Sequence, residues 1–265
     1  MLLTTIYSIL SWINEAPSST SEFITLTFYH NRDFMRFGLQ KLTLLDYPEH
    51  VACTVFTSGC NMRCPFCHNA DLAVGNDSSL PETHESLLEF LKARKKILDG
   101  VCITGGEPLL HQETVDLLSE IKSLGLKVKL DTNGSYPGRL KTAVNEGLVD
   151  MVAMDIKNSR EKYQVTTGGC DLLDKVRESV DFLLTEKISY EFRTTVTGNL
   201  HTPEDFIDIG SWIAGKSRYF LQKFKDSGNV LAGVPTMSVD DNFMEKCLAN
   251  AKLFLPNAAI RGVER

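Results

Sequence analysis

The chain has 265 residues, of which 43% are hydrophobic and 23% are charged, a composition typical of a globular protein with a substantial core. Its net charge of −6 gives no electrostatic reason to expect a nucleic acid or an anionic membrane as a partner. Seven cysteines, an odd number without the spacing of a disulfide framework, favour a reducing compartment and a metal site. We therefore expect a cytoplasmic protein that binds neither nucleic acid nor membrane.

The first part of the chain, 1–34, differs from the rest. It contains the apolar run MLLTTIYSILSWI and a Ser/Thr-rich patch with few charges. The run has no preceding Lys or Arg, is too short to span a bilayer as a helix, and is not followed by a clear cleavage site, so we expect no signal peptide. The sequence predicts a poorly ordered or appended extension at 1–34 and one domain at 35–265.

From residue 51 onward, β-rich runs alternate with segments of helical period. The runs predict strands at 51–56, 100–105, 127–132, 151–156, 190–196 and 218–224, with a possible edge strand in NAAIRGV, 257–263. Helices are predicted between them at 83–98, 112–125, 138–147, 171–187 and 203–215, with caps at Thr83, Asp171 and Thr202 and ends at Gly125 and Gly147. Six such units predict an α/β fold, a partial (β/α)6 TIM-type barrel with a mostly parallel sheet and outer helices.

Polar residues end the predicted strands, at the edge where α/β barrels carry their active sites. Together they predict a cavity suited to a polar, zwitterionic ligand. Two features complicate this pattern: Lys127 and Lys129 share a face with Asp131, and Glu191 shares one with Arg193. Either these residues pair across the sheet lower in the barrel, or the strand phase slips by one residue. The polar strand ends are the loop with three cysteines, TGGEP (104–108), DTNG (131–134), DIK (155–157), Arg193 and Gln222.

Cys60, Cys64 and Cys67 form a cluster of three thiols in TSGCNMRCPFCHN. A structural zinc site takes four protein ligands and a disulfide takes two, whereas three cysteines on a [4Fe–4S] cube leave one iron open for amino and carboxylate groups. A ferredoxin-like carrier or a zinc module would explain the thiols but not the polar strand ends. Cys53 and Cys102 lie in apolar runs and are predicted to be core residues.

The segment CNMRCPFC resembles the Cys-x3-Cys-x-aromatic-Cys signature of the radical S-adenosylmethionine (SAM) enzymes. GGEP, 105–108, resembles the segment with which that family binds the amino group of the cofactor's methionine. The resemblance is strongest to the activating proteins of anaerobic ribonucleotide reductase and spans roughly 38–263. It rests on LLDYPEHVACTVFTSGCNMRCPFCHN, ITGGEPLL, KLDTNG, VDMVAMDIK, YEFRTTV and YFLQKF, in this order.

The resemblance implies one [4Fe–4S] cluster and SAM as cofactors, and a flavodoxin or ferredoxin-type electron donor. It also implies reductive cleavage of SAM to a 5′-deoxyadenosyl radical that abstracts a glycine hydrogen from a partner, so no side chain is expected to act as an acid or base. The partner implied is the large subunit of anaerobic ribonucleotide reductase. Alternatives are another glycyl-radical enzyme, such as pyruvate formate-lyase, or a small molecule, as in the 7-carboxy-7-deazaguanine synthases.

The resemblance also implies roles for individual residues. Cys60, Cys64 and Cys67 would hold the cluster, with SAM on the fourth iron. The remaining residues would contact SAM: Phe66 beside the adenine, Gly105 and Gly106 along the methionine moiety, Glu107 and Asp131 at the ammonium, Lys157 and Arg193 at the carboxylate, Asp155 at the ribose, and Gln222 near the adenine or ribose.

Overall fold

The computed structural model describes residues 35–75, 80–225, 230–231 and 238–262. The chain divides into two compact units, Met1–Met35 and Arg36–Arg265. The extension predicted at 1–34 lies outside the described residues. Within the described ranges, no helix combines the length and the apolar composition needed to cross a membrane.

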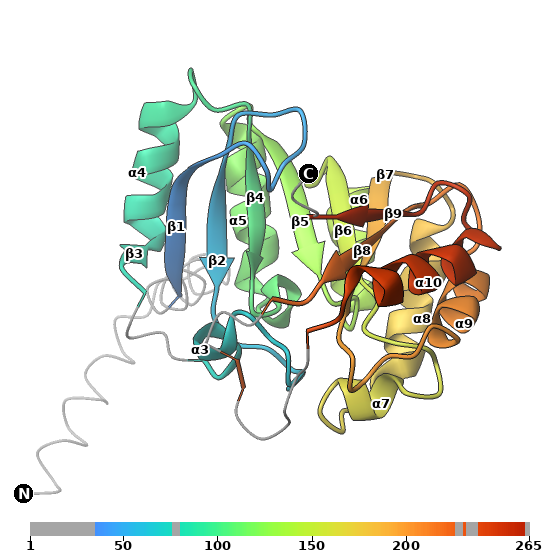
Figure 1. Ribbon diagram of the computed structural model, residues 1–265. Coiled ribbons are helices and arrows are strands. Elements are labelled where there is room, and N and C mark those ends of the chain that lie inside the picture. The colour runs from blue at the N-terminus through green and yellow to red at the C-terminus, as the bar shows by residue number, and fades with distance from the viewer. Residues whose placement is uncertain (1–34, 76–79, 226–229, 232–237, 263–265) are drawn as a thin grey trace, which may run out of the picture. The chain divides into compact units, whose positions relative to one another are not determined.

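One twisted sheet organises Arg36–Arg265, with strand order β3-β1-β2-β4-β5-β6-β7-β8-β9 (Figure 1). From β2 to β9 all neighbouring strands are parallel, whereas β1 and β3 pair antiparallel at one edge. The strands are β1 (Arg36–Thr43), β2 (Ala52–Thr57), β3 (Glu82–Thr83), β4 (Gly100–Gly105), β5 (Lys127–Thr132), β6 (Met151–Asp155), β7 (Ser189–Val196), β8 (Arg218–Lys223) and β9 (Ala259–Arg261).

Helical segments connect the parallel strands, as βαβ units require. Figure 1 shows α5 behind β4 and β5, and α8, α9 and α10 together beside the later strands. The segments are α3 (Ala70–Ala73), α4 (His84–Arg94), the 3-10 helix η2 (Pro108–Leu110), α5 (Glu113–Ser123), α6 (Pro137–Asn145), α7 (Tyr163–Thr166), α8 (Leu173–Leu183), α9 (Asp205–Trp212) and α10 (Asp241–Lys252).

The predicted partial (β/α)6 barrel is confirmed. Each of β2, β4, β5, β6, β7 and β8 is followed by at least one helix, and β9 adds the parallel edge strand expected near the C-terminus. The bounds of all six predicted strands agree with the structure to within one residue. Six elements were not predicted: β1, β3, α3, η2, α7 and α10.

The helix ends agree in part with the predicted signals. Thr83 caps α4 as predicted, because its hydroxyl accepts from the backbone N–H of Ser86 in a reciprocal capping box. The caps predicted at Asp171 and Thr202 are wrong, since α8 and α9 begin two and three residues later without a side-chain cap. The backbone N–H of Thr202 instead donates to the carboxylate of Asp205 over 2.7 Å.

The core lies between the sheet and its helices. It includes a fully buried apolar residue from each of six parallel strands: Val55, Ile103, Leu130, Val152, Phe192 and Leu221. Cys53 and Cys102 are also fully buried, so the prediction that they are core residues is confirmed. Their burial between apolar neighbours agrees with the behaviour of free cysteine as a small hydrophobic residue.

The charged residues of the inner face are paired, which resolves the two alternatives for the strand phase. The ammonium of Lys129, 2% exposed, contacts Asp131 on the same strand. The carboxylate of Glu191, fully buried, accepts two hydrogen bonds from Arg261 of β9, over 2.7 and 2.9 Å. Lys127 lies 2.9 Å from the ring of His50. Lys127 is exposed, whereas Lys129 and Glu191 are buried. The predicted phase is therefore correct, and the charges of Lys129 and Glu191 pair inside the barrel.

We expect Arg261→Ala to lower the free energy of unfolding by about 3 kcal/mol, because it leaves the buried Glu191 carboxylate without its cation. It also removes a guanidinium that lies 3.6 Å from the ring centroid of Phe220. Urea denaturation followed by circular dichroism measures the change. Arg218→Ala, at an exposed position of the neighbouring strand, is the control and should cost less than about 0.5 kcal/mol. Equal losses in the two variants would contradict the assignment.

Candidate functional site

The three clustered cysteines lie in the loop between β2 and α3, and backbone hydrogen bonds hold this loop in place. The N–H of Gly59 donates to the carbonyl of Leu72 over 2.7 Å, and the N–H of Arg63 donates to that of Thr167 over 3.0 Å. The side-chain amide of Asn69 donates to the carbonyl of Gly105 over 3.0 Å. The loop is thus tied to α3, to the end of α7 and to the end of β4.

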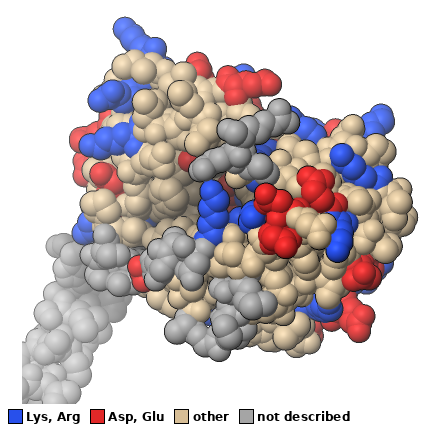
Figure 2. All heavy atoms as spheres, in the orientation of Figure 1, with Lys and Arg blue, Asp and Glu red and all other residues tan. Residues whose placement is uncertain are grey.

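A cavity of about 420 Å³ opens at the C-terminal ends of the strands. This volume is within the range of roughly 300–1,000 Å³ found for small-molecule sites. The face of the molecule in Figure 2 is hollowed near its centre, where basic and acidic side chains meet. Of the twelve predicted site residues, eleven line the cavity: Cys60, Cys64, Phe66, Cys67, Gly105, Gly106, Asp131, Asp155, Lys157, Arg193 and Gln222.

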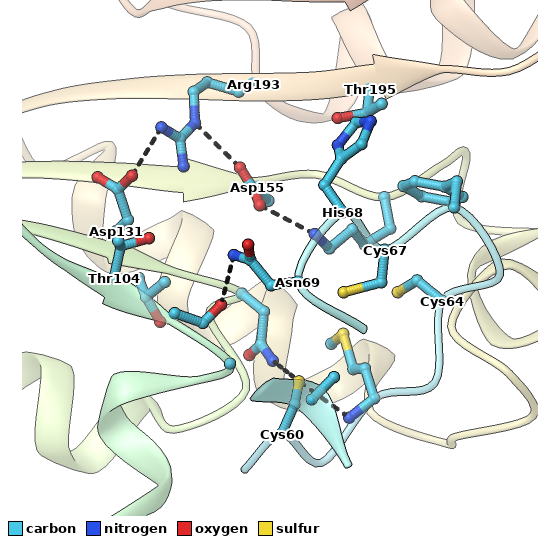
Figure 3. Close-up of a pocket in the computed structure, with 18 of the residues that line it drawn as sticks. Cys60, Cys64, Cys67, His68, Asn69, Thr104, Asp131, Asp155, Arg193 and Thr195 are labelled. Atoms are coloured by element: carbon cyan, nitrogen blue, oxygen red, sulfur yellow. Dashed lines mark hydrogen bonds and ion pairs between the residues drawn. The ribbon is translucent and has the colours of Figure 1, made fainter. Parts of the chain in front are cut away.

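A chain of alternating charges crosses the cavity wall from β5 to β7 (Figure 3). The guanidinium of Arg193 donates to Asp131 and to Asp155, over 3.0 Å in both cases. Lys157 donates to the second oxygen of Asp155 over 2.9 Å, and Lys129 contacts the second oxygen of Asp131. Three cations thus share two carboxylates, and a third carboxylate, that of Asp46, also lines the cavity.

The charge chain keeps both of its carboxyl groups ionised. Burial alone would raise the pKa of Asp155, but the charges of Lys157 and Arg193 outweigh it and lower the pKa to about 2. The pKa of Asp131 is also lowered, because Arg193 and Lys129 together exceed the effect of burial. Burial disfavours the charged form of Lys157, yet Asp155 raises its pKa above the usual value. Asp131, Asp155 and Lys157 are therefore charged at neutral pH.

Glu107 is the one predicted site residue that does not line the cavity. Its carboxylate is fully buried and accepts three hydrogen bonds, from Leu109 N over 3.0 Å, from the Thr132 hydroxyl over 2.8 Å and from Asn133 N over 2.6 Å. Burial raises the pKa of this carboxyl to about 7, although the three donors oppose the rise. In this structure Glu107 therefore joins the end of β4 to the end of β5.

Gly105 and Gly106 are required by the packing of backbone against backbone. A Cβ at Gly105 would lie 2.2 Å from the carbonyl oxygen of Thr57, and one at Gly106 would lie 2.0 Å from that of Gly59. Gly105 also has a φ of +120°, which favours glycine. The family resemblance implied that both positions are glycine so that the backbone can approach the methionine moiety of SAM. The structure adds a second reason, the contact between the GGEP segment and the loop with the cysteines.

The three cysteines are free thiols that face one cavity. Among the described residues, no three His, Cys, Asp or Glu side chains are placed to hold a single metal ion. A [4Fe–4S] cube binds each thiolate to a different iron, so its cysteines have to line one cavity and do not converge on one point. Burial raises the pKa of Cys64 to about 12, while the charge of Lys157 opposes this rise. The donor set and the cavity both fit such a cluster.

Several lining residues were not predicted as site residues, although the sequence carried signals for some of them. Thr195 follows Arg193 by two positions and therefore shares its face of β7, so strand alternation could have identified it. Asn133 belongs to the polar DTNG segment. No strand-end signal marks Asp46, which precedes β2. The unpredicted residues are Asp46, Met62, His68, Asn69, Ala73, Thr104, Thr132, Asn133 and Thr195.

We expect Asp155→Asn to lower the free energy of unfolding at pH 7 by about 2 kcal/mol. The wild-type carboxyl has a pKa of about 2, below its unfolded value of about 3.9, so folding favours the ionised form. This stabilisation is complete above about pH 4 and is lost as the pH falls through about 2, where the two proteins should converge. Urea denaturation across this range tests it, with the 98%-exposed Asp174 changed to Asn as control. A difference that persists at pH 2 would contradict the prediction.

Comparisons with known proteins agree with this site. The sequence profile of the Radical SAM superfamily matches residues 54–213. A putative glycyl-radical enzyme activating enzyme of Methanocaldococcus jannaschii is 30% identical over 196 residues, which cover 71% of this chain and 79% of that protein. The pyruvate formate-lyase-activating enzyme of Clostridium pasteurianum is 32% identical over 136 residues, 49% of this chain and 56% of that protein.

The fold is also similar to that of a solved structure. Streptococcus suis SuiB bound to S-adenosylmethionine superposes with a TM-score of 0.60 at 14% identity, over 78% of this chain and 49% of that one. At this identity the likeness concerns the fold alone. Family membership rests on the profile match, which covers more than half of the chain, and on the relative from M. jannaschii. The chain therefore belongs to the radical SAM superfamily, whose cofactors are a [4Fe–4S] cluster and S-adenosylmethionine.

Proposed function

We propose that this protein activates a glycyl-radical enzyme. The observation that carries the proposal is that three free cysteines and a chain of alternating charges line one cavity. The names of the two relatives, both activating enzymes, support the same reaction class. When bound, the cofactors supply the chemistry, in which an electron from the cluster cleaves SAM to a 5′-deoxyadenosyl radical that abstracts a glycine hydrogen.

In this proposal Cys60, Cys64 and Cys67 are the cluster ligands, and their loop positions them. The N–H of Glu107 donates to the carbonyl of Gly59 over 2.8 Å, which joins the GGEP segment to this loop. A cluster held by these three cysteines would have one iron without a protein ligand, which would be open to the amino and carboxylate groups of SAM.

The charged strand ends orient SAM. Its carboxylate would lie against Lys157 and Arg193, the Lys and Arg side chains that line the cavity. Its ammonium would face Asp131, whose carboxyl stays ionised, and its ribose hydroxyls would face Asp155. Glu107 acts as a positioning residue that joins GGEP to DTNG, because its carboxylate is occupied by three protein donors.

The apolar part of the cavity takes the nucleoside. Phe66, 4% exposed, would pack beside the adenine, and Gln222 at the end of β8 would lie near the adenine or ribose. The protein binds, orients and shields the reacting groups, and none of its side chains acts as a general acid or base. Its electron donor is a flavodoxin or a ferredoxin-type protein.

We propose the large subunit of anaerobic ribonucleotide reductase as the partner, because six segments of the chain, in order, resemble the activating proteins of that enzyme. Pyruvate formate-lyase is the second candidate, since the relative from C. pasteurianum is named as its activating enzyme. Either enzyme would store a glycyl radical. One assay for that radical, run with each enzyme in turn, therefore distinguishes the two candidates.

We expect the reduced protein, mixed anaerobically with SAM and the reductase large subunit, to produce the doublet EPR signal of a glycyl radical. The reductase with its radical glycine changed to alanine is the control and should give no doublet. A doublet that forms with pyruvate formate-lyase but not with the reductase would favour the second candidate. Cleavage of SAM without a doublet from either enzyme would contradict activation and point to a small-molecule substrate.

We expect Cys64→Ala to abolish assembly of the [4Fe–4S] cluster, because two thiolates are too few to retain the cube. Iron and sulfide content and the EPR signal of the reduced protein measure the loss. Cys170→Ala is the matched control, since Cys170 is a partly exposed free thiol that does not line the cavity, and it should retain the full cluster. A complete cluster in Cys64→Ala would contradict the ligand assignment.

A further inference from the structure

The surroundings of the Cys60 sulfur differ from those of the other two clustered thiols. Cys60 Sγ accepts a hydrogen bond from the backbone N–H of Met62, over 3.4 Å, and one from the side-chain amide of Asn133, over 3.8 Å. Within the ranges that the structure describes, the sulfur atoms of Cys64 and Cys67 accept no such bond. Figure 3 shows the contact to Cys60 as a dashed line. One thiol of the three therefore has a side-chain donor.

The orientation of the Asn133 amide follows from its neighbours. Its Oδ1 accepts from the backbone N–H of Ser135 over 2.9 Å, and a backbone N–H can only donate. Nδ2 is therefore the atom that faces Asn61 Oδ1, at 3.0 Å, and Cys60 Sγ. The reverse orientation of the amide would place two donors against each other and leave the sulfur without a donor.

Asn133 is also held firmly in place. It is 5% exposed, and its backbone N–H donates to the buried carboxylate of Glu107 over 2.6 Å. Ser135 and Asn61 bind each other as well, over 2.9 Å, so the amide lies in a closed network of hydrogen bonds. A donor fixed in this way keeps its direction whether or not a ligand occupies the cavity.

We propose that Asn133 tunes the reduction potential of the cluster through its hydrogen bond to Cys60. The inference rests on the proposed function, in which Cys60 is a cluster ligand. Reduction by one electron adds negative charge that is shared with the ligand sulfur atoms. An N–H directed at one of these atoms stabilises the reduced state more than the oxidised state and so raises the potential. Asn133 thereby makes the cluster easier for its electron donor to reduce.

Two substitutions test this role. Asn133→Leu removes the amide donor and keeps a side chain of similar size. Asn133→Asp replaces the amide nitrogen with a carboxylate oxygen, which repels the sulfur. Redox titration of the reconstituted proteins, followed by EPR, should give potentials in the order wild type, Asn133→Leu, Asn133→Asp, from highest to lowest. For Asn133→Leu, the ratio of reduced to oxidised cluster at a fixed potential should fall about threefold, as expected for one weak hydrogen bond.

The order of the two variants distinguishes tuning from a structural role. A residue that only supports the fold would shift both variants alike or lower their stability without a change in potential, and either result would overturn the proposal. Asn145→Leu, which removes an exposed amide from α6, is the control and should leave the potential unchanged.

A measurement on the wild-type residue covers the case in which the variants lose their cluster. Protein labelled with 15N-asparagine should show a 15N coupling to the reduced cluster in pulsed EPR, and the coupling should persist in Asn61→Ser. Its absence would overturn the role of Asn133. If the wild-type protein assembles no cluster, the proposed function itself fails, whereas an intact cluster with unchanged potentials overturns only this inference.

Discussion

The ion pairs of Arg193 with Asp131 and Asp155 are the interaction on which the rest of the site depends. Each member would be costly to bury alone, and the cost is offset because every charge has a partner at hydrogen-bond distance. The pairs bring the ends of β5, β6 and β7 together and fix the positions of the polar groups before any ligand binds. Lys157 and Arg193 line the cavity and are the cations that suit a ligand with a carboxylate.

A second constraint is the close contact between the loop with the cysteines and the GGEP segment. Backbone carbonyls of Thr57 and Gly59 occupy the space where side chains at 105 and 106 would lie. Glu107 extends this contact to the end of β5 through its three hydrogen bonds. Hydrogen bonds thus link the loop, GGEP and DTNG, and Asn133 of DTNG also contacts the sulfur of Cys60 in the loop.

Much of the fold could be predicted, because parallel strands covered by helices are nearly continuous apolar runs. The antiparallel strand β1 was missed, since RFGLQKLT mixes polar and apolar residues without clear alternation. The caps at Asp171 and Thr202 failed because a capping residue type near a helix does not determine where the first turn begins. Asp205 instead accepts a hydrogen bond from the backbone N–H of Thr202, three residues before it, which is one half of a capping box without the N–H to hydroxyl bond that completes it.

The sequence by itself determined the family, the order of the βα units and the set of polar strand ends, because motif spacing and strand period are local properties of the chain. Only the tertiary structure decided which polar groups pair. Glu107 turned inward to three protein donors, Arg193 bound the carboxylates of two other strands, and Glu191 found Arg261 about seventy positions away along the chain. Such choices depend on distances between strands and on the high cost of a buried charge without a partner, and neither is a property of a single segment.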